Sequence, residues 1–151
     1  MPNRFNVFLD TSVLFSAVYS AGGGARMILK LGEARAINLW VGPWVLREAE
    51  AVIERKAATS KALFAVLLDR SMVQVTREAT PKEVTVARQT VPYPADAQIL
   101  AEAIVSGADY FVSFDREHFL GNPDVHALSF RVGTAGDSLE WYRQQLTRND
   151  D

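Results

Sequence analysis

Short apolar runs alternate with helix-like segments along the whole chain, and this alternation constrains the fold most strongly. The apolar runs have the length and composition of buried strands, and they lie at 6–9, 37–41, 72–75, 110–114 and 128–132. Segments with helical composition lie between and after them, at 25–31, 43–56, 61–70, 95–105 and 136–146. Parallel strands need long crossovers, so this order predicts an α/β fold with a mainly parallel sheet of about five strands.

Glycine and proline mark the expected boundaries of these elements. Gly22-Gly23-Gly24 breaks the chain before the first helix, which could extend through 34–36, and Gly42-Pro43 closes the second strand and opens a helix. Thr80-Pro81 opens a weaker helix that Pro92 and Pro94 are expected to interrupt.

The size and composition indicate one domain, expected over 1–147 with a polar tail at 148–151. The chain has 151 residues, 48% of them hydrophobic, and no Cys, which excludes a disulfide scaffold, a thiolate metal site and a cysteine nucleophile. No apolar run approaches a membrane span, so we expect a cytoplasmic protein without a membrane partner. The net charge of -2 gives no overall electrostatic indication of nucleic-acid binding.

Two aspartates follow apolar strands at the points where these strands end. Asp10 ends the first run and Asp115 follows the run at 110–114. In open parallel sheets the functional site lies beyond the carboxyl ends of the strands, so both side chains are expected at that edge. Aspartate is also a common helix cap or turn former, and this second interpretation applies to each residue alone.

Asp96 lies on the apolar side of its predicted helix. At 100° per residue it falls near the centre of the arc set by Ile99, Leu100, Ala103 and Ile104. An acid in a first helical turn also interacts with free N–H groups and the helix dipole, but it need not face the core to do so. An inward carboxylate needs a partner, and a metal ion supplies one.

The helix after Pro43 carries two further candidate acids, Glu48 and Glu50. Its apolar residues place the two glutamates symmetrically on opposite flanks of the apolar arc, so periodicity does not choose between them. Both are also compatible with a solvated surface.

Carboxylates gathered at one sheet edge would repel each other and raise each other's pKa unless a cation neutralised them. With no Cys and two His in the chain, hard oxygen ligands predict Mg²⁺ or Mn²⁺ and argue against a zinc site. Carboxylate-bound Mg²⁺ commonly keeps water ligands and binds phosphate, which fits the hydrolysis of a phosphodiester.

Three stretches together resemble the PIN domain, especially its single-domain bacterial members that are toxins of toxin–antitoxin pairs. The stretches are DTSVLFSA, GPWVLREAEAVIER and PADAQILAEAIVSGADYFVSFDREHF, and the resemblance covers nearly the whole chain. It implies a three-layer α/β/α fold and a metal-dependent ribonuclease that acts on RNA. It also implies a small antitoxin protein as partner and a homodimer.

The resemblance assigns roles to individual residues. Asp10, Asp96 and Asp115 match the three acidic motif positions, and Glu48 matches the helix glutamate by its distance from Pro43, with Glu50 as the alternative.

Hydroxyl and basic residues beside these acids are further candidates. Thr11 and Ser113 match the family's supporting hydroxyls, whereas Ser12 stands where Asn is often found, and ordinary strand-end or cap bonding is the other interpretation of all three. The basic residues expected to meet the RNA backbone are Arg47, Arg116 and His118. The phenylalanines in or beside the apolar strands, including Phe114, are expected in the core.

Two other functions compete with this one. A phosphatase with Asp10 as covalent nucleophile would want another Asp two residues later, where this chain has Ser12. A non-catalytic domain that binds RNA or protein would keep the carboxylates without using them.

Overall fold

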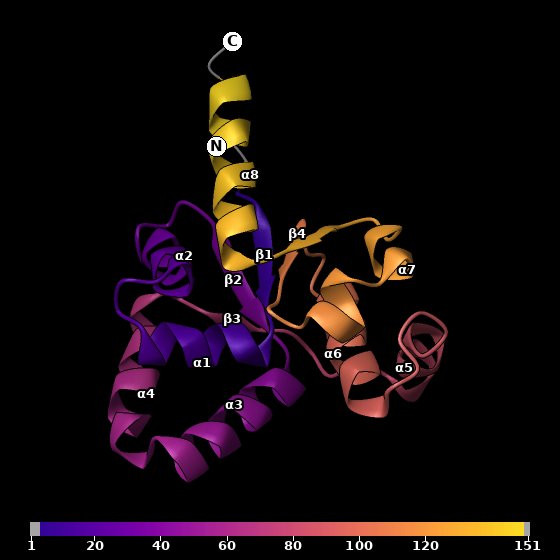
Figure 1. The fold of residues 1–151 in the computed structure, drawn as a ribbon, viewed down its shortest axis with the longest axis horizontal. Coiled ribbons are helices and arrows are strands. Elements are labelled where there is room, and N and C mark those ends of the chain that lie inside the picture. Colours follow the sequence, from indigo (N-terminus) through magenta and orange to yellow (C-terminus); the bar gives the residue numbers. More distant parts are fainter. Residues whose placement is uncertain (1–3, 150–151) are drawn as a thin grey trace.

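A five-stranded, entirely parallel sheet forms the centre of the molecule in the computed structural model, which describes residues 4–149 (Figure 1). The strand order is β3-β2-β1-β4-β5. The strands are β1 Asn6–Leu9, β2 Asn38–Val41, β3 Gln74–Val75, β4 Tyr110–Val112 and β5 Arg131–Gly133. The predicted α/β class and the parallel five-stranded sheet are therefore confirmed.

Helices cover the sheet on both sides. They are α1 Thr11–Tyr19, α2 Gly24–Glu33, α3 Pro43–Lys56, α4 Lys61–Arg70, α5 Pro81–Ala87, α6 Pro94–Val105, α7 Pro123–His126 and α8 Ala135–Asn149, with short helical turns η1 Ala58–Ser60 and η2 Arg116–Leu120. In Figure 1, α1 to α4 gather on one side of the strands and α5 to α7 on the other. Over residues 4–149, no helix is long and apolar enough to cross a membrane.

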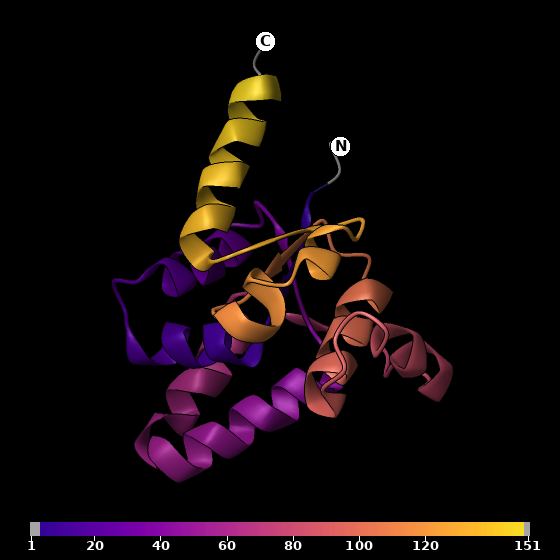
Figure 2. The same ribbon diagram turned by 45° about the vertical axis from the view of Figure 1, so that its right-hand side comes forward.

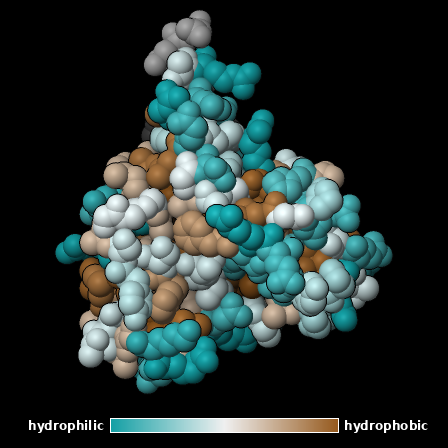
Figure 3. Space-filling view, viewed as in Figure 1, coloured by the Kyte–Doolittle hydropathy of each residue, from teal (hydrophilic) through white to brown (hydrophobic). Residues whose placement is uncertain are grey.

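The last helix, α8, extends away from the body of the molecule (Figure 2). Its first turns pack on the domain, where Trp141 lies edge-on to Phe5 with ring centroids 4.8 Å apart. Hydrophilic side chains cover much of its projecting part (Figure 3). The polar tail expected at 148–151 is helical as far as Asn149, and residues 150–151 lie outside the described part of the chain.

The central strands are buried on both faces, as expected for a parallel sheet covered by helices on both sides. Phe8 of β1 and Phe111 of β4 are fully buried and stack with ring centroids 5.6 Å apart. Phe111 also contacts Phe119 and Phe130. This aromatic group fixes β1 and β4 side by side at the middle of the sheet.

The helix α1 is an element that the sequence analysis missed, because only one helix was expected between the first two strands. Its sequence TSVLFSAVY is rich in β-branched and aromatic residues, which are weaker helix formers. The carboxylate of Asp10 caps its first turn, and five of its residues are buried, so tertiary packing outweighs the local propensity. Gly22 and Gly23 lie between α1 and α2, and Gly24 is the first residue of α2.

The helix opened by Thr80-Pro81 ends at Ala87, before Pro92 and Pro94, as expected. Other boundaries differ from the prediction for backbone reasons. Pro94 itself occupies the first turn of α6, where its missing N–H costs nothing, so α6 begins one residue before the predicted start. Arg35 and Met72 have φ values of 61° and 56°, in the left-handed region. The first ends α2 before residues 34–36, and the second shortens β3 relative to the predicted 72–75. The last strand starts only at Arg131 because Leu128 still belongs to the turn after α7.

A buried carboxylate joins α6 to the start of α3. Glu102 has no exposed surface, and its Oε1 and Oε2 accept hydrogen bonds from the Trp44 main-chain N at 3.1 and 3.4 Å. Gln98 Nε2 donates to the same carboxylate at 3.2 Å. Glu102 thus satisfies a free N–H group in the first turn of α3, where the helix dipole favours negative charge.

This contact requires a glycine at position 42. A Cβ added there would lie 1.9 Å from Glu102 Oε1 and 2.6 Å from Glu102 Cβ. The second atom is close to the backbone of α6 and cannot swing away, so a larger residue would push α3 and α6 apart.

We expect Gly42→Ala to lower the free energy of unfolding by about 1–3 kcal/mol, the usual cost of overpacking a core. Urea denaturation of the purified chain measures this loss. Gly22→Ala is the matched control, because a Cβ there meets nothing within 4 Å, and it should change stability by less than about 1 kcal/mol. Equal stability of the two variants would show that the contact with Glu102 does not restrict position 42.

Candidate active site

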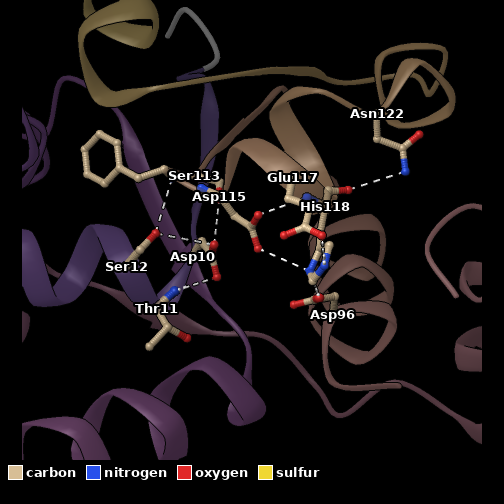
Figure 4. Close-up of polar contacts among 10 residues, drawn as sticks. Asp10, Thr11, Ser12, Asp96, Ser113, Asp115, Glu117, His118 and Asn122 are labelled. Carbon is tan, nitrogen blue, oxygen red and sulfur yellow. Dashed lines mark hydrogen bonds and ion pairs between the residues drawn. The ribbon is translucent and has the colours of Figure 1, made fainter. Parts of the chain in front are cut away.

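The carboxylate of Asp10 lies at the carboxyl end of β1, buried to 5% exposure and hydrogen-bonded on both oxygens (Figure 4). Its Oδ1 accepts from the Thr11 main-chain N at 2.7 Å, and its Oδ2 accepts from Ser113 Oγ at 2.7 Å. Ser12 Oγ lies 3.5 Å from the same Oδ2. The strand end and the first turn of α1 together hold this carboxylate in one orientation.

The same hydroxyls hold the loop that carries Asp115. Ser113 Oγ accepts from the Asp115 main-chain N at 3.0 Å while it donates to Asp10. Ser12 Oγ accepts from the Phe114 main-chain N at 3.3 Å. Ser12, which follows β1, and Ser113, which follows β4, therefore link the two strand ends that carry Asp10 and Asp115.

The third aspartate meets Asp115 through a histidine. Asp96, in the first turn of α6, contacts His118 Nδ1 through its Oδ2, and the same nitrogen lies 3.5 Å from Asp115 Oδ2 (Figure 4). The His118 main-chain N donates to Asp115 Oδ1 at 2.9 Å. The imidazole of His118 stacks on Tyr93 with ring centroids 4.0 Å apart.

All four predicted acids line one cleft, which has a volume of about 360 Å³. Its walls are formed by Asp10, Thr11, Ser12, Phe15, Glu48, Val52, Lys56, Asp96, Ile99, Phe114 and Asp115. Glu48 is half-buried in this cleft, whereas Glu50 is exposed and lines a different cavity between α3 and α4. The tertiary structure thus distinguishes two glutamates that helix periodicity left equivalent.

The surroundings of Asp10 and Asp96 disfavour the negative charge of these two carboxylates. Burial raises the pKa of Asp10 to about 6, against the lowering effect of hydrogen bonds from Ser113 and Thr11, and the charges of Glu48 and Asp115 raise it further. Burial also raises the pKa of Asp96, an effect that His118 opposes and that Asp115 and Glu48 reinforce. A cation in the cleft would offset both the desolvation of these carboxylates and the repulsion between them.

The donor atoms fit a divalent metal ion. One ligand atom each from Asp96, Asp115 and His118 lies within 4.8 Å of the other two, and Asp10 and Glu48 line the same cleft. Carboxylate oxygens and an imidazole nitrogen are common ligands of divalent ions. The raised carboxylate pKa values are what an anionic site shows without its cation.

The supporting residues expected from the sequence lie around these acids in different ways. Ser113 and Ser12 contribute hydroxyls, but Thr11 contributes its main-chain N–H, and its buried hydroxyl makes no hydrogen bond within residues 4–149. Arg116 is exposed, and Arg47 lies over the Trp44 ring and 4.0 Å from Glu78. A contact of Arg47 or Arg116 with RNA stays a prediction.

Several cleft residues were missed or misplaced by the sequence analysis. Phe114, expected in the core, is 37% exposed and lines the cleft, because it follows the end of β4. Lys56 also lines it, and the spacing of four residues from Glu48 through Val52 to Lys56 on α3 was a signal that could have found it. His118, expected to meet the RNA backbone, also contacts Asp96 and lies close to Asp115, and its contact with RNA stays a prediction.

The sequence model of the PIN domain matches residues 6–117. The chain belongs to the PIN-domain family. A comparison with curated protein sequences gave no match.

Solved structures with this fold include VapBC proteins and the toxin VapC20. The chain is similar to VapBC2 from Rickettsia felis bound to a promoter DNA fragment, at 14% identity and a TM-score of 0.64, over 86% of this chain and 98% of the other. A protein from Pyrobaculum aerophilum is 16% identical, with a TM-score of 0.66, over 93% of this chain and 90% of the other. VapC20 from Mycobacterium tuberculosis, a toxin that cleaves the sarcin–ricin loop, is 18% identical, with a TM-score of 0.53, over 74% of this chain and 92% of the other.

In this PIN domain the burial of Asp10 predicts a pH-dependent stability when divalent ions are chelated. Its folded-state pKa of about 6 lies above the ordinary value of 3.8, so the folded state binds the proton more tightly than the unfolded state. The resulting stability is present below pH 3.8 and is lost as pH rises to about 6, on the order of 3 kcal/mol in all.

Urea unfolding in EDTA between pH 4 and 7 measures this loss. Asp10→Asn cannot ionise there, so relative to the wild type it should become more stable as pH rises. Parallel pH curves for the two proteins would show that folding does not raise the pKa of Asp10.

Proposed function

We propose that this PIN domain is a divalent-metal-dependent endoribonuclease, the toxin of a toxin–antitoxin pair, acting in the cytoplasm. The observation that carries the proposal is the convergence of four carboxylates from four separate elements on one cleft. Asp10 follows β1, Glu48 lies on α3, Asp96 on α6, and Asp115 follows β4. Membership of the PIN-domain family supports the nuclease activity.

The carboxylates of Asp10, Glu48, Asp96 and Asp115 would hold Mg²⁺ or Mn²⁺. When bound, the ion supplies an activated water and stabilises negative charge on the leaving oxygen. The chain's own residues position these ligands: Ser113, Ser12 and the Thr11 N–H orient the carboxylate of Asp10, and the Ser113 hydroxyl also fixes the loop at Asp115.

The walls of the cleft suit a nucleic-acid strand. Lys56 offers a positive charge for a phosphate, and the exposed ring of Phe114 offers a stacking surface for a base. Arg47 and Arg116 are the further residues proposed to contact the RNA backbone. RNA as the substrate is supported by VapC20, a structural relative that cleaves the sarcin–ricin loop.

The proposed partners are a small antitoxin and a second copy of the chain. The support comes from the structural relatives: VapBC2 from Rickettsia felis was solved bound to a DNA fragment from its promoter, and VapBC from Salmonella typhimurium was solved bound to DNA. The resemblance to single-domain toxins also supports a homodimer.

A domain that only binds RNA or protein is the competing function, and the burial of Asp10 argues against it. Burying a carboxyl group and surrounding it with other acids costs stability, and binding alone does not require this. The covalent phosphatase is disfavoured because Ser12, which stands where its second Asp would be, is engaged with Asp10 and the Phe114 N–H.

The purified protein should cut RNA in the presence of Mg²⁺ or Mn²⁺ and not with Ca²⁺, leaving a 5′-phosphate. In-line attack by water needs the strict octahedral positioning that the smaller ions provide, and Ca²⁺ is coordinated more flexibly. End-labelled single-stranded RNA, followed by phosphatase or ligase treatment of the fragments, identifies the ends. A 2′,3′-cyclic phosphate, or full activity in EDTA, would overturn the mechanism.

Two glutamates on the same helix give a matched test of the site. Glu48→Gln should reduce cleavage by about 100-fold or more, whereas Glu50→Gln should stay within a few-fold of the wild type, because only Glu48 lines the acidic cleft. Equal effects at positions 48 and 50 would contradict the proposed site.

Asp96→Asn should also abolish cleavage, with a Tm in EDTA at least that of the wild type, because it removes one repelling charge.

A further inference from the structure

His118 lies where an imidazole can serve the same ion as the carboxylates. Its Nδ1 contacts Asp96 Oδ2 and lies 3.5 Å from Asp115 Oδ2, so the three donor atoms surround one point between α6 and the loop after β4 (Figure 4). Two of these residues were already assigned to the acidic site from the sequence. The third is a nitrogen donor that the proposed Mg²⁺ or Mn²⁺ site did not include.

The ring of His118 is held in this orientation on several sides. Tyr93 stacks on its face at 4.0 Å with the planes 23° apart, and the His118 main-chain N donates to Asp115 Oδ1 at 2.9 Å. The side chain is 23% exposed. A histidine fixed only by a surface ion pair would not need a stacked partner and a main-chain hydrogen bond to the same aspartate.

The two ring nitrogens face different surroundings. Nδ1 faces the two aspartates, and Nε2 lies 3.8 Å from Oε1 of Glu117, whose side chain is exposed. Histidines that bind metal usually direct the other ring nitrogen toward a carboxylate, a carbonyl or water, which fixes the tautomer. In this structure Nδ1 donates its hydrogen to Asp96 Oδ2. An ion would replace this hydrogen: with the proton on Nε2, the Nδ1 lone pair would point toward an ion held by Asp96 and Asp115.

We propose that His118 is a metal ligand through Nδ1, together with Asp96 and Asp115, and that it makes the site prefer Mn²⁺ to Mg²⁺. The inference rests on the proposed metal-dependent function and specifies its ion. Imidazole suits transition-metal ions, whereas Mg²⁺ is bound almost entirely through oxygen. A site with carboxylates alone would lack this basis for discrimination.

Pulsed EPR of Mn²⁺ bound to the full-length protein tests the nitrogen ligand directly, because a ligating ¹⁴N gives a hyperfine coupling that oxygen ligands do not. The chain has two histidines, so His126→Ala leaves His118 as the only imidazole and is the matched control. His126 Nε2 contacts the Leu120 carbonyl oxygen at 2.6 Å, away from the cleft residues. We expect the coupling in the wild type and in His126→Ala, and its loss in His118→Ala.

Titration of free Mn²⁺ and Mg²⁺ gives the second measurement. His118→Ala should bind Mn²⁺ at least about tenfold more weakly while its Mg²⁺ affinity changes less, and His126→Ala should match the wild type. The wild-type and His126→Ala spectra decide the ligand even if His118→Ala does not fold.

The outcomes separate this inference from the proposed function. If Mn²⁺ binds and RNA is cut but no nitrogen coupling is seen, His118 is not a ligand and the ribonuclease proposal stands. If His118→Ala weakens both ions equally, His118 only positions the acids, and the preference for Mn²⁺ is wrong. If neither ion binds, both proposals fail.

Discussion

The parallel pairing of β1 with β4 is the contact on which the site depends. In this register Leu9 lies beside Val112, and the pairing continues one residue further, where the Asp10 N–H donates to the Val112 carbonyl at 3.0 Å. Ser113, the residue after β4, is thereby placed so that its hydroxyl donates to the Asp10 carboxylate. A slip of one residue would turn every side chain of the strand to the opposite face. The buried stack of Phe8 on Phe111 resists such a slip, so apolar packing in the sheet determines the geometry of a polar site at its edge.

That geometry has an energetic cost, because the site gathers like charges around a buried carboxyl group. Asp10 has hydrogen bonds on both oxygens, and even so burial raises its pKa to about 6. Hydrogen bonding therefore compensates only part of the desolvation. The imidazole of His118 between Asp96 and Asp115 is the local compensation that the chain itself offers. A cation would complete it, and this links the stability of the domain to occupancy of its cleft.

The sequence was informative where a residue's place follows from a local pattern. Asp10 and Asp115 could be placed because apolar strands end beside them, and Asp96 because its helix has a continuous apolar face. Local patterns fail where tertiary contacts decide. Glu48 and Glu50 flank the same apolar arc, and only the packing of α3 beside α1 and α6 brings the first into the cleft. His118 depends on the short turn Arg116–Leu120, which folds its side chain back toward α6 and which no periodicity indicates. Helix α1 was missed because its burial outweighs its weak propensity.

The acids lie on two structural units that must be fixed to each other. The sheet places Asp10 and Asp115, whereas Glu48 and Asp96 lie on α3 and α6, which contact each other over a few residues. The buried carboxylate of Glu102, on α6, strengthens this contact because it accepts a hydrogen bond from the first turn of α3. Gly42 allows the two helices to approach closely at this point. Glu102 is six residues beyond Asp96 on one helix, and its partner Trp44 is four residues before Glu48 on the other. A polar contact outside the cleft therefore helps to fix the position of Glu48 relative to Asp96, together with the packing of α3 beside α1.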